Sequence, residues 1–74
     1  MKKDIQIEEV EISTEFIKLD SLLKFTGVAE TGGQAKEIIA DGVVYVNGEQ
    51  CLMRGKKIRK GDKVYLAGVE IHIV

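Results

Sequence analysis

The sequence has no proline, and it has a single cysteine and a single histidine among its 74 residues. Without proline, no segment has the composition of a stiff linker, and the length suits one domain covering residues 1–74. Cys51 has no partner for an internal disulfide, which fits a reducing compartment. One cysteine and one histidine are too few for the ligand cluster that a bound metal requires. The composition therefore predicts one domain without a disulfide, a metal or another cofactor.

Long apolar runs are missing as well. No stretch approaches the roughly 18 apolar residues that a membrane-spanning helix requires. The basic start, Met1–Asp4, is followed by Glu8, Glu9 and Glu11, so the apolar region of a secretory signal peptide is absent. These absences predict a cytoplasmic protein without a membrane partner.

Groups that could perform catalysis are scarce. A domain of this size buries only about 60% of the surface that its unfolded chain exposes, which leaves little room for an enclosed active site. His72 alternates out of phase with Ile71 and Ile73, so we expect it on the solvated face of a terminal strand. Cys51 has no histidine nearby in the sequence and is expected to fill a small space in the core. The sequence therefore predicts no catalytic residue, no enzyme and no small-molecule substrate.

The spacing of apolar residues predicts two helices. Leu19, Leu22 and Leu23 share one face of the first helix, and Gly27 is placed to end it. The connection over residues 28–30 is short, so the second helix is expected to fold back against the first. The second helix is expected to begin at Thr31 with a capping box, in which Thr31 accepts from the amide of Gln34 and Gln34 reaches back. Gly42 would end this helix, and its core-facing residues would be Ala35, Ile38 and Ile39.

Strand patterns flank the two helices. Residues 5–12 alternate with one slip of parity at Glu8–Glu9, which predicts a half-buried strand with a bulge or a break. Residues 43–46 are β-branched or aromatic, and Asn47–Gly48 is the strongest short signal for a hairpin. Further strands are expected at 49–53, 63–66 and 69–73. The element order predicts an α+β fold, with a two-helix hairpin packed on a small antiparallel sheet.

Positive charge is concentrated in the second half of the chain. Residues 1–33 contain four lysines and seven carboxylates, whereas residues 34–74 contain seven basic and five acidic residues. The densest run of basic residues extends from Arg54 to Lys60. It is predicted to be a loop that a turn at Gly61–Asp62 closes. A positive patch on a protein with a net charge of −1 can attract phosphate locally. The basic residues of this run are Arg54, Lys56, Lys57, Arg59 and Lys60.

Three features are consistent with phosphate binding. The start of the second helix offers free amides, which Gly32 and Gly33 would leave accessible, although plain helix capping explains the same glycines equally well. Lys18, Lys24 and Lys36 lie on or beside the helices, off the apolar stripes, where a solvated face is the alternative. The basic loop could likewise be a solvated turn. Because the three features occur together, phosphate binding is the favoured interpretation.

The order of these motifs along the chain resembles that of one known family. The positions that carry the resemblance are Ile17-Lys18-Leu19-Asp20, Leu22-Leu23, Gly27, Gln34-Ala35, Ile38-Ile39, Gly42, Val44, Val46-Asn47-Gly48 and Gly61-Asp62. They resemble the ribosomal-protein-S4-like RNA-binding domain, or alpha-L motif, over residues 17–66, with an N-terminal and a C-terminal strand added. Residues 31–36 and 54–57 also resemble the short, free-standing bacterial members of this family.

The resemblance implies a surface of two helices and the adjoining hairpin that docks on structured RNA. Ribosomal RNA or tRNA would be the target, and the ribosome or its assembly intermediates the larger partner. Many members have arginine where this chain has Lys18, and Ser-Arg where it has Gly32–Gly33, which implies contacts through lysines and backbone amides instead of arginine forks. The residues expected to contact RNA are Lys18, Lys24, Thr31, Gly32, Gly33, Gln34, Lys36, Asn47, Arg54, Lys56, Lys57, Arg59 and Lys60.

Recognition is expected to depend on RNA shape and phosphate. A-form RNA hides its base edges in a deep, narrow groove, and the chain has few aromatic residues for stacking on unpaired bases. Tyr45 and Tyr65 are expected in the core or on the sheet surface. The alternative function is that of a protein–protein interaction adaptor, whose acidic N-terminal strand pairs with a partner's sheet edge.

Overall fold

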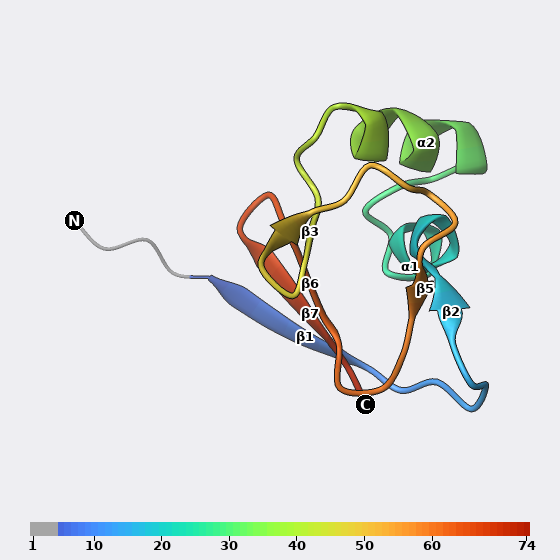
Figure 1. The fold of residues 1–74 in the computed structure, drawn as a ribbon, viewed down its shortest axis with the longest axis vertical. Coiled ribbons are helices and arrows are strands. Elements are labelled where there is room, and N and C mark those ends of the chain that lie inside the picture. Colours follow the sequence, from blue (N-terminus) through green and yellow to red (C-terminus); the bar gives the residue numbers. More distant parts are fainter. Residues whose placement is uncertain (1–4) are drawn as a thin grey trace.

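Two helices lie together beside a five-stranded sheet in the computed structural model, which describes residues 5–74 (Figure 1). The α+β fold class predicted from the sequence is confirmed. The basic start of the chain, Met1–Asp4, lies outside the described residues. The elements are β1 (Gln6–Val10), β2 (Ile17–Lys18), α1 (Leu19–Phe25), α2 (Gly32–Ala40), β3 (Tyr45–Val46), β4 (Glu49–Gln50), β5 (Lys57–Ile58), β6 (Lys63–Leu66) and β7 (Val69–Ile73).

The helices form where the apolar spacing predicts them. Leu19, Leu22 and Leu23 are all fully buried, and α2 folds back against α1. The capping box differs from the prediction in one bond. The Gln34 amide donates to Thr31 Oγ1 over 3.1 Å as expected, but Gln34 Oε1 accepts from the amide of Glu30, one residue before the cap.

The sheet has the order β1-β7-β6-β3-β4, and it is mixed. The predicted antiparallel sheet is correct for the other pairs, but β1 runs parallel to β7. Parallel pairing requires a long crossover connection, and both helices lie between these two strands in the sequence. The β1–β7 register is continuous, so the parity slip at Glu8–Glu9 produces no bulge. Instead Ile5 and Ile7 lie exposed, while Val10 is buried.

Two tight hairpins build the rest of the sheet. Asn47 and Gly48 have φ values of 52° and 87°, as a two-residue turn between right-handed twisted strands requires. The strands on either side are shorter than predicted, because only Tyr45–Val46 and Glu49–Gln50 pair. Ala67 and Gly68 form the second such turn, with φ values of 51° and 80°. An alanine in a left-handed conformation carries no turn signal in the sequence.

The basic run was predicted as a loop, and this prediction is wrong for its centre. Lys57–Ile58 forms β5, which pairs antiparallel with Ile17–Lys18 of β2. Ile58 is fully buried in the core. Burial of this single isoleucine, together with backbone pairing, outweighs the tendency of a charged run to remain in solvent. The basic run is therefore attached to the helical half of the molecule.

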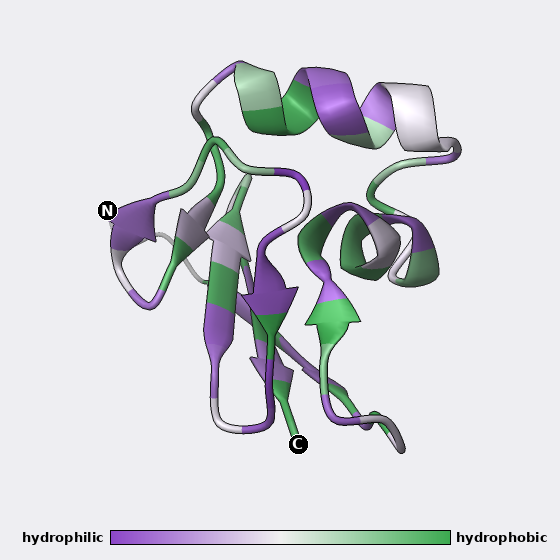
Figure 2. Cartoon of the chain, turned by 45° about the vertical axis from the view of Figure 1, so that its right-hand side comes forward, coloured by the Kyte–Doolittle hydropathy of each residue, from purple (hydrophilic) through white to green (hydrophobic). Residues whose placement is uncertain are grey.

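The core lies between the helices and one face of the sheet, and hydrophobic residues are found on both of these layers (Figure 2). Among residues 5–74 no polar or charged side chain is buried, so every charge in this range stands at the surface. Within the same range, no helix has the length and apolar character that crossing a membrane demands.

Candidate functional site

The first turn of α1 is bonded to the basic run. The amide of Leu19 donates to the carbonyl of Lys56 over 2.9 Å, and the amide of Asp20 donates to the carbonyl of Arg54 over 3.0 Å. Free amides at a helix start normally require caps or ligands, and here the basic run satisfies two of them. The backbone of this run is thereby fixed relative to α1, although its charged side chains remain in solvent.

Lys18 and Lys57 face each other across the β2–β5 pair. Because the neighbouring Leu19 amide bonds to Lys56, the alternation of an antiparallel ladder makes Lys18 and Lys57 a non-hydrogen-bonded pair. The Cβ atoms of such pairs lie about 4.5–5.5 Å apart, and like charges directly opposite each other are destabilising. The hydrophilic ends of β2 and β5 lie side by side in Figure 2. An anion placed across both ammonium groups would remove this repulsion.

Phe16 contacts Lys57 and one further cation, Arg59. The Lys57 ammonium nitrogen lies 4.9 Å from the centroid of the Phe16 ring, and the Arg59 guanidinium carbon lies 5.8 Å from it. Each such cation–π contact contributes about 0.5–1 kcal/mol at an exposed site. Phe16 was not predicted as a site residue, because only the pairing of β2 with β5 brings it beneath these two side chains.

Within residues 5–74 no carboxylate lies within ion-pair distance of these lysines and arginines, so their charges are not neutralised in that range. We call the surface formed by six exposed residues the basic face. Its members are Lys18, Arg54, Lys56, Lys57, Arg59 and Lys60.

The start of α2 provides a second place for an anion. The Thr31 hydroxyl occupies the Gln34 amide, but the amides of Gly32 and Gly33 have no acceptor within residues 5–74. Neither glycine has a positive φ, and a Cβ at Gly33 would meet only Thr31 Oγ1, at 3.9 Å. Relief of steric strain therefore does not explain these two glycines. Their exposed amides and the positive end of the helix dipole suit a phosphate group.

The remaining predicted contact residues lie elsewhere. Lys24 and Lys36 are exposed on α1 and α2. Asn47 is exposed, but its side chain is engaged in hydrogen bonds within the protein, because its Nδ2 donates to Asp62 over 3.1 Å and its Oδ1 accepts from the Lys63 amide over 3.0 Å. Asn47 thus ties the first hairpin turn to the turn at Gly61–Asp62, and the structure gives it a positioning role.

The single histidine and the single cysteine do not belong to the basic face. Nε2 of His72 lies 2.8 Å from Oε1 of Glu70, and the two side chains are 25% and 33% exposed. As predicted, His72 lies on the last strand of the chain, out of phase with the buried Ile71 and Ile73, and it is partly exposed; within the sheet that strand, β7, is an inner one with β1 beyond it. Cys51 is partly buried against the core, as expected. Within residues 5–74, no three His, Cys, Asp or Glu residues are grouped so that they could hold a metal ion.

Known proteins resemble this chain over most of its length. A family model for the S4 domain matches residues 10–74. A probable ribosome maturation protein, RlbA, of Bacillus subtilis is 39% identical over 59 residues, which are 80% of this chain and 83% of that protein. A putative RNA-binding protein, YbcJ, of Escherichia coli is 40% identical over 58 residues, or 78% of this chain and 83% of that protein. A tyrosine–tRNA ligase of Staphylococcus haemolyticus is 33% identical over 58 residues, which are only 14% of that enzyme.

Proposed function

The chain belongs to the S4 domain family, and on this premise we propose that it is a non-catalytic module that binds structured RNA through the basic face. The proposal agrees with the descriptions of two relatives, a probable ribosome maturation protein and a putative RNA-binding protein. The third relative, the tRNA ligase, matches over 14% of its length, so most of that enzyme has no counterpart in the match.

One observation carries the proposal: Lys18 and Lys57 stand directly opposite each other on a backbone that is bonded to α1. A protein gains no stability from two exposed lysines held face to face. The arrangement becomes favourable when a phosphate backbone lies across it, because each neutralised phosphate also releases a counterion. Phe16 supports the same geometry by holding Lys57 and Arg59.

The start of α2 would supply a second contact to the RNA backbone. Gly32 and Gly33 offer amides to phosphate, Thr31 and Gln34 hold the turn in shape, and Lys24 and Lys36 add charge on the two helices. Contacts of these kinds recognise phosphate positions, and hence the shape of a folded RNA. We therefore expect base-paired or folded RNA to be preferred over single strands and over DNA.

Ribosomal RNA or tRNA is the target that we propose. Ribosome maturation in one relative's description supports ribosomal RNA, or an assembly intermediate of the ribosome, and the ligase supports tRNA. Both RNAs are found in the cytoplasm, which is the compartment that we propose. We propose no cofactor and no small-molecule substrate for this function.

A second candidate is a protein–protein interaction adaptor, which the position of β1 favours. This strand lies at the edge of the sheet and pairs on one side with β7. Glu8, Glu9 and Glu11 are exposed along and just after it, so its free edge suits a basic strand of a partner. Purified protein that carries nucleic acid, seen as excess absorbance near 260 nm that high salt removes, would favour the RNA-binding function.

The direct test is a binding titration against salt. The chain is mixed with a labelled RNA hairpin and with a DNA hairpin of the same sequence, and fluorescence anisotropy is recorded at several salt concentrations. Neutralisation of four to six phosphates predicts a log–log slope of about −3 to −5 for the RNA, with weaker binding to the DNA. RNA affinity that stays constant between low and moderate salt would contradict the proposal.

The control for this titration is a matched pair of variants. Lys57→Gln and Gln6→Glu each lower the net charge by one, but Gln6 lies on β1, outside the basic face. Lys57→Gln should weaken RNA binding and make the salt slope shallower by about one unit. Gln6→Glu should leave both unchanged, and equal effects of the two variants would indicate that only net charge matters.

A further inference from the structure

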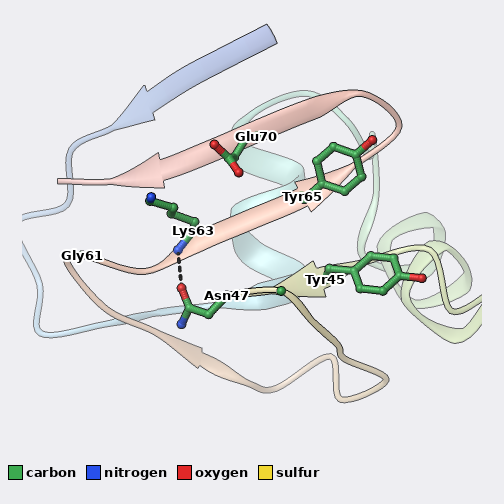
Figure 3. Close-up of a pocket in the computed structure, with 7 residues that line it drawn as sticks. Tyr45, Asn47, Gly61, Lys63, Tyr65 and Glu70 are labelled. Carbon is green, nitrogen blue, oxygen red and sulfur yellow. Dashed lines mark hydrogen bonds between the residues drawn. The ribbon is translucent and has the colours of Figure 1, made fainter. Parts of the chain in front are cut away.

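The sheet face turned away from the helices carries a shallow hollow that the proposed RNA contacts do not use. Core residues such as Val64 and Ile71 point to the helices, so their neighbours on β6 and β7 point outward. Figure 3 shows these outward side chains, with Lys63 toward the Gly61 end of the hollow and the two tyrosines at the other end. We call this surface the tyrosine face, and its members are Tyr45, Lys63, Tyr65 and Glu70.

Two aromatic rings form one side of the hollow. Tyr45 and Tyr65 are partners in the register of β3 and β6, with ring centroids 6.5 Å apart and ring planes inclined by 55°. The inclined rings do not cover each other face to face, and Tyr45 is 37% exposed. An accessible ring face on a rigid sheet suits a flat, aromatic ligand, and base stacking of this kind contributes about 1–3 kcal/mol.

The charged groups in the hollow suit the other parts of a nucleotide. Lys63 is exposed and has no ion pair within residues 5–74, so its ammonium group is available to a phosphate. Glu70 shares Oε1 with His72, and its second oxygen has no hydrogen-bond partner in the same range. A carboxylate oxygen can accept a hydrogen bond from the exocyclic amino group of a base.

One tight turn joins the basic run to the edge of the hollow at Gly61. The Arg59 amide donates to Asp62 Oδ2 over 2.8 Å, and the Asp62 amide donates to the Arg59 carbonyl over 3.0 Å. Gly61 lies within this turn with a φ of 94° and lines the hollow. A strand of RNA that follows the cations past Lys60 would therefore reach the Gly61 end of the tyrosine face, where Lys63 lies.

We propose that the tyrosine face binds one unpaired nucleotide of the RNA whose folded part docks on the basic face. The base lies against Tyr45, the more exposed of the two rings, the phosphate lies near Lys63, and Glu70 accepts from an amino group of the base. Adenine, cytosine and guanine carry such a group, whereas uracil does not. This inference rests on the proposed function and extends it, because it adds base contacts to recognition by shape and phosphate.

Tyrosine emission provides a test, because the chain has two tyrosines and no tryptophan. Three synthetic RNAs share one hairpin: a blunt form, a form with adenosine tails at both ends, and a form with uridine tails. The adenosine tails should quench tyrosine emission and raise affinity by about fivefold or more over the blunt hairpin. The uridine tails should have a smaller effect.

Two variants locate the effect on the sheet. Tyr45→Leu should abolish the gain in affinity from adenosine tails, while Tyr45→Phe, which keeps the ring, should preserve it. Circular dichroism checks that both variants fold. Lys63→Gln changes an exposed side chain and provides an independent variant, which should reduce the gain from the tails but leave binding of the blunt hairpin nearly unchanged.

The titrations of the three hairpins test this inference separately from the proposed function. If all three hairpins bind with the same salt-dependent affinity and tyrosine emission does not change, the tyrosine face is not an RNA site. The face would then be a candidate interface for a protein, and RNA binding by the basic face would stand. If no hairpin binds, the proposed function is wrong, and the inference that rests on it is wrong as well.

Discussion

The ammonium nitrogen of Lys57 lies 4.9 Å from the centroid of the Phe16 ring, while Lys18 stands opposite Lys57 on the neighbouring strand. The ring therefore restrains a side chain that repulsion from Lys18 would otherwise push into solvent. Arg59 contacts the same ring, at 5.8 Å. Because the Phe16 ring already restrains these cations, the chain loses less conformational entropy when phosphate binds. Phe16 is therefore a positioning residue.

Phe16→Leu tests this role. Loss of cation–π contacts worth about 0.5–1 kcal/mol each should weaken binding of an RNA hairpin by about two- to fivefold. Phe25→Leu is the matched control, since Phe25 is the other phenylalanine and is 70% exposed. Anisotropy titrations of the two folded variants should differ, and equal affinities would mean that Phe16 only fills space.

The double variant Lys56→Glu/Lys57→Glu tests the basic face as a whole. Its affinity for the RNA hairpin should fall by well over about tenfold, and its salt slope should become shallower by about two units, one for each lost phosphate contact. Thermal stability should hold or rise slightly, because repulsion within the basic face decreases. A folded double variant that binds RNA as tightly as the parent would make the basic run a solvated turn and favour the adaptor function.

Lys18→Glu should change stability and RNA binding in opposite directions. It replaces a like-charge pair across β2 and β5 with an ion pair, which should raise the free energy of unfolding by about 0.2–1 kcal/mol at low salt. The same change should weaken RNA binding. Urea unfolding followed by circular dichroism measures the first effect, and the gain should shrink in high salt.

Lys24→Glu is the control for that gain in stability. It makes the same change of charge in the last turn of α1, where a carboxylate is unfavourable to the helix dipole. Lys24→Glu should therefore not raise the free energy of unfolding. If both variants gain equal stability, relief of general repulsion explains the result, and the Lys18–Lys57 contact is not special.

Gly33→Val tests phosphate binding at the start of α2. Its Cβ would meet only Thr31 Oγ1, at 3.9 Å, so the free energy of unfolding should change by no more than about 1 kcal/mol. The branched side chain should keep phosphate from the amides and weaken RNA binding by about three- to fivefold. Ala40→Val places the same side chain at the other, exposed end of the helix and should leave RNA affinity unchanged. If Gly33→Val binds RNA as tightly as the parent chain, plain helix capping is the favoured interpretation of these glycines.

The helices and the first hairpin were predictable because their signals are local. The leucine spacing over residues 19–23 indicated which side of α1 is buried, and all three leucines are fully buried. Asn47–Gly48 indicated a two-residue turn, and both residues have the positive φ that it requires. The turn at Ala67–Gly68 was not predictable from its first residue, because strand pairing on both sides imposes the positive φ on an alanine.

The sequence by itself determined the α+β class, the two amphipathic helices and a dense run of cations, since these depend on neighbours within a few residues. The tertiary structure alone decided how the cations are arranged. Pairing of β2 with β5 sets Lys18 opposite Lys57 and brings Lys57 over Phe16, and the parallel pairing of β1 turns Ile7 outward. The physical reason is that strand pairing between distant segments is fixed by burial of residues such as Ile58 in a shared core, and periodicity within one segment cannot specify the partner or the register.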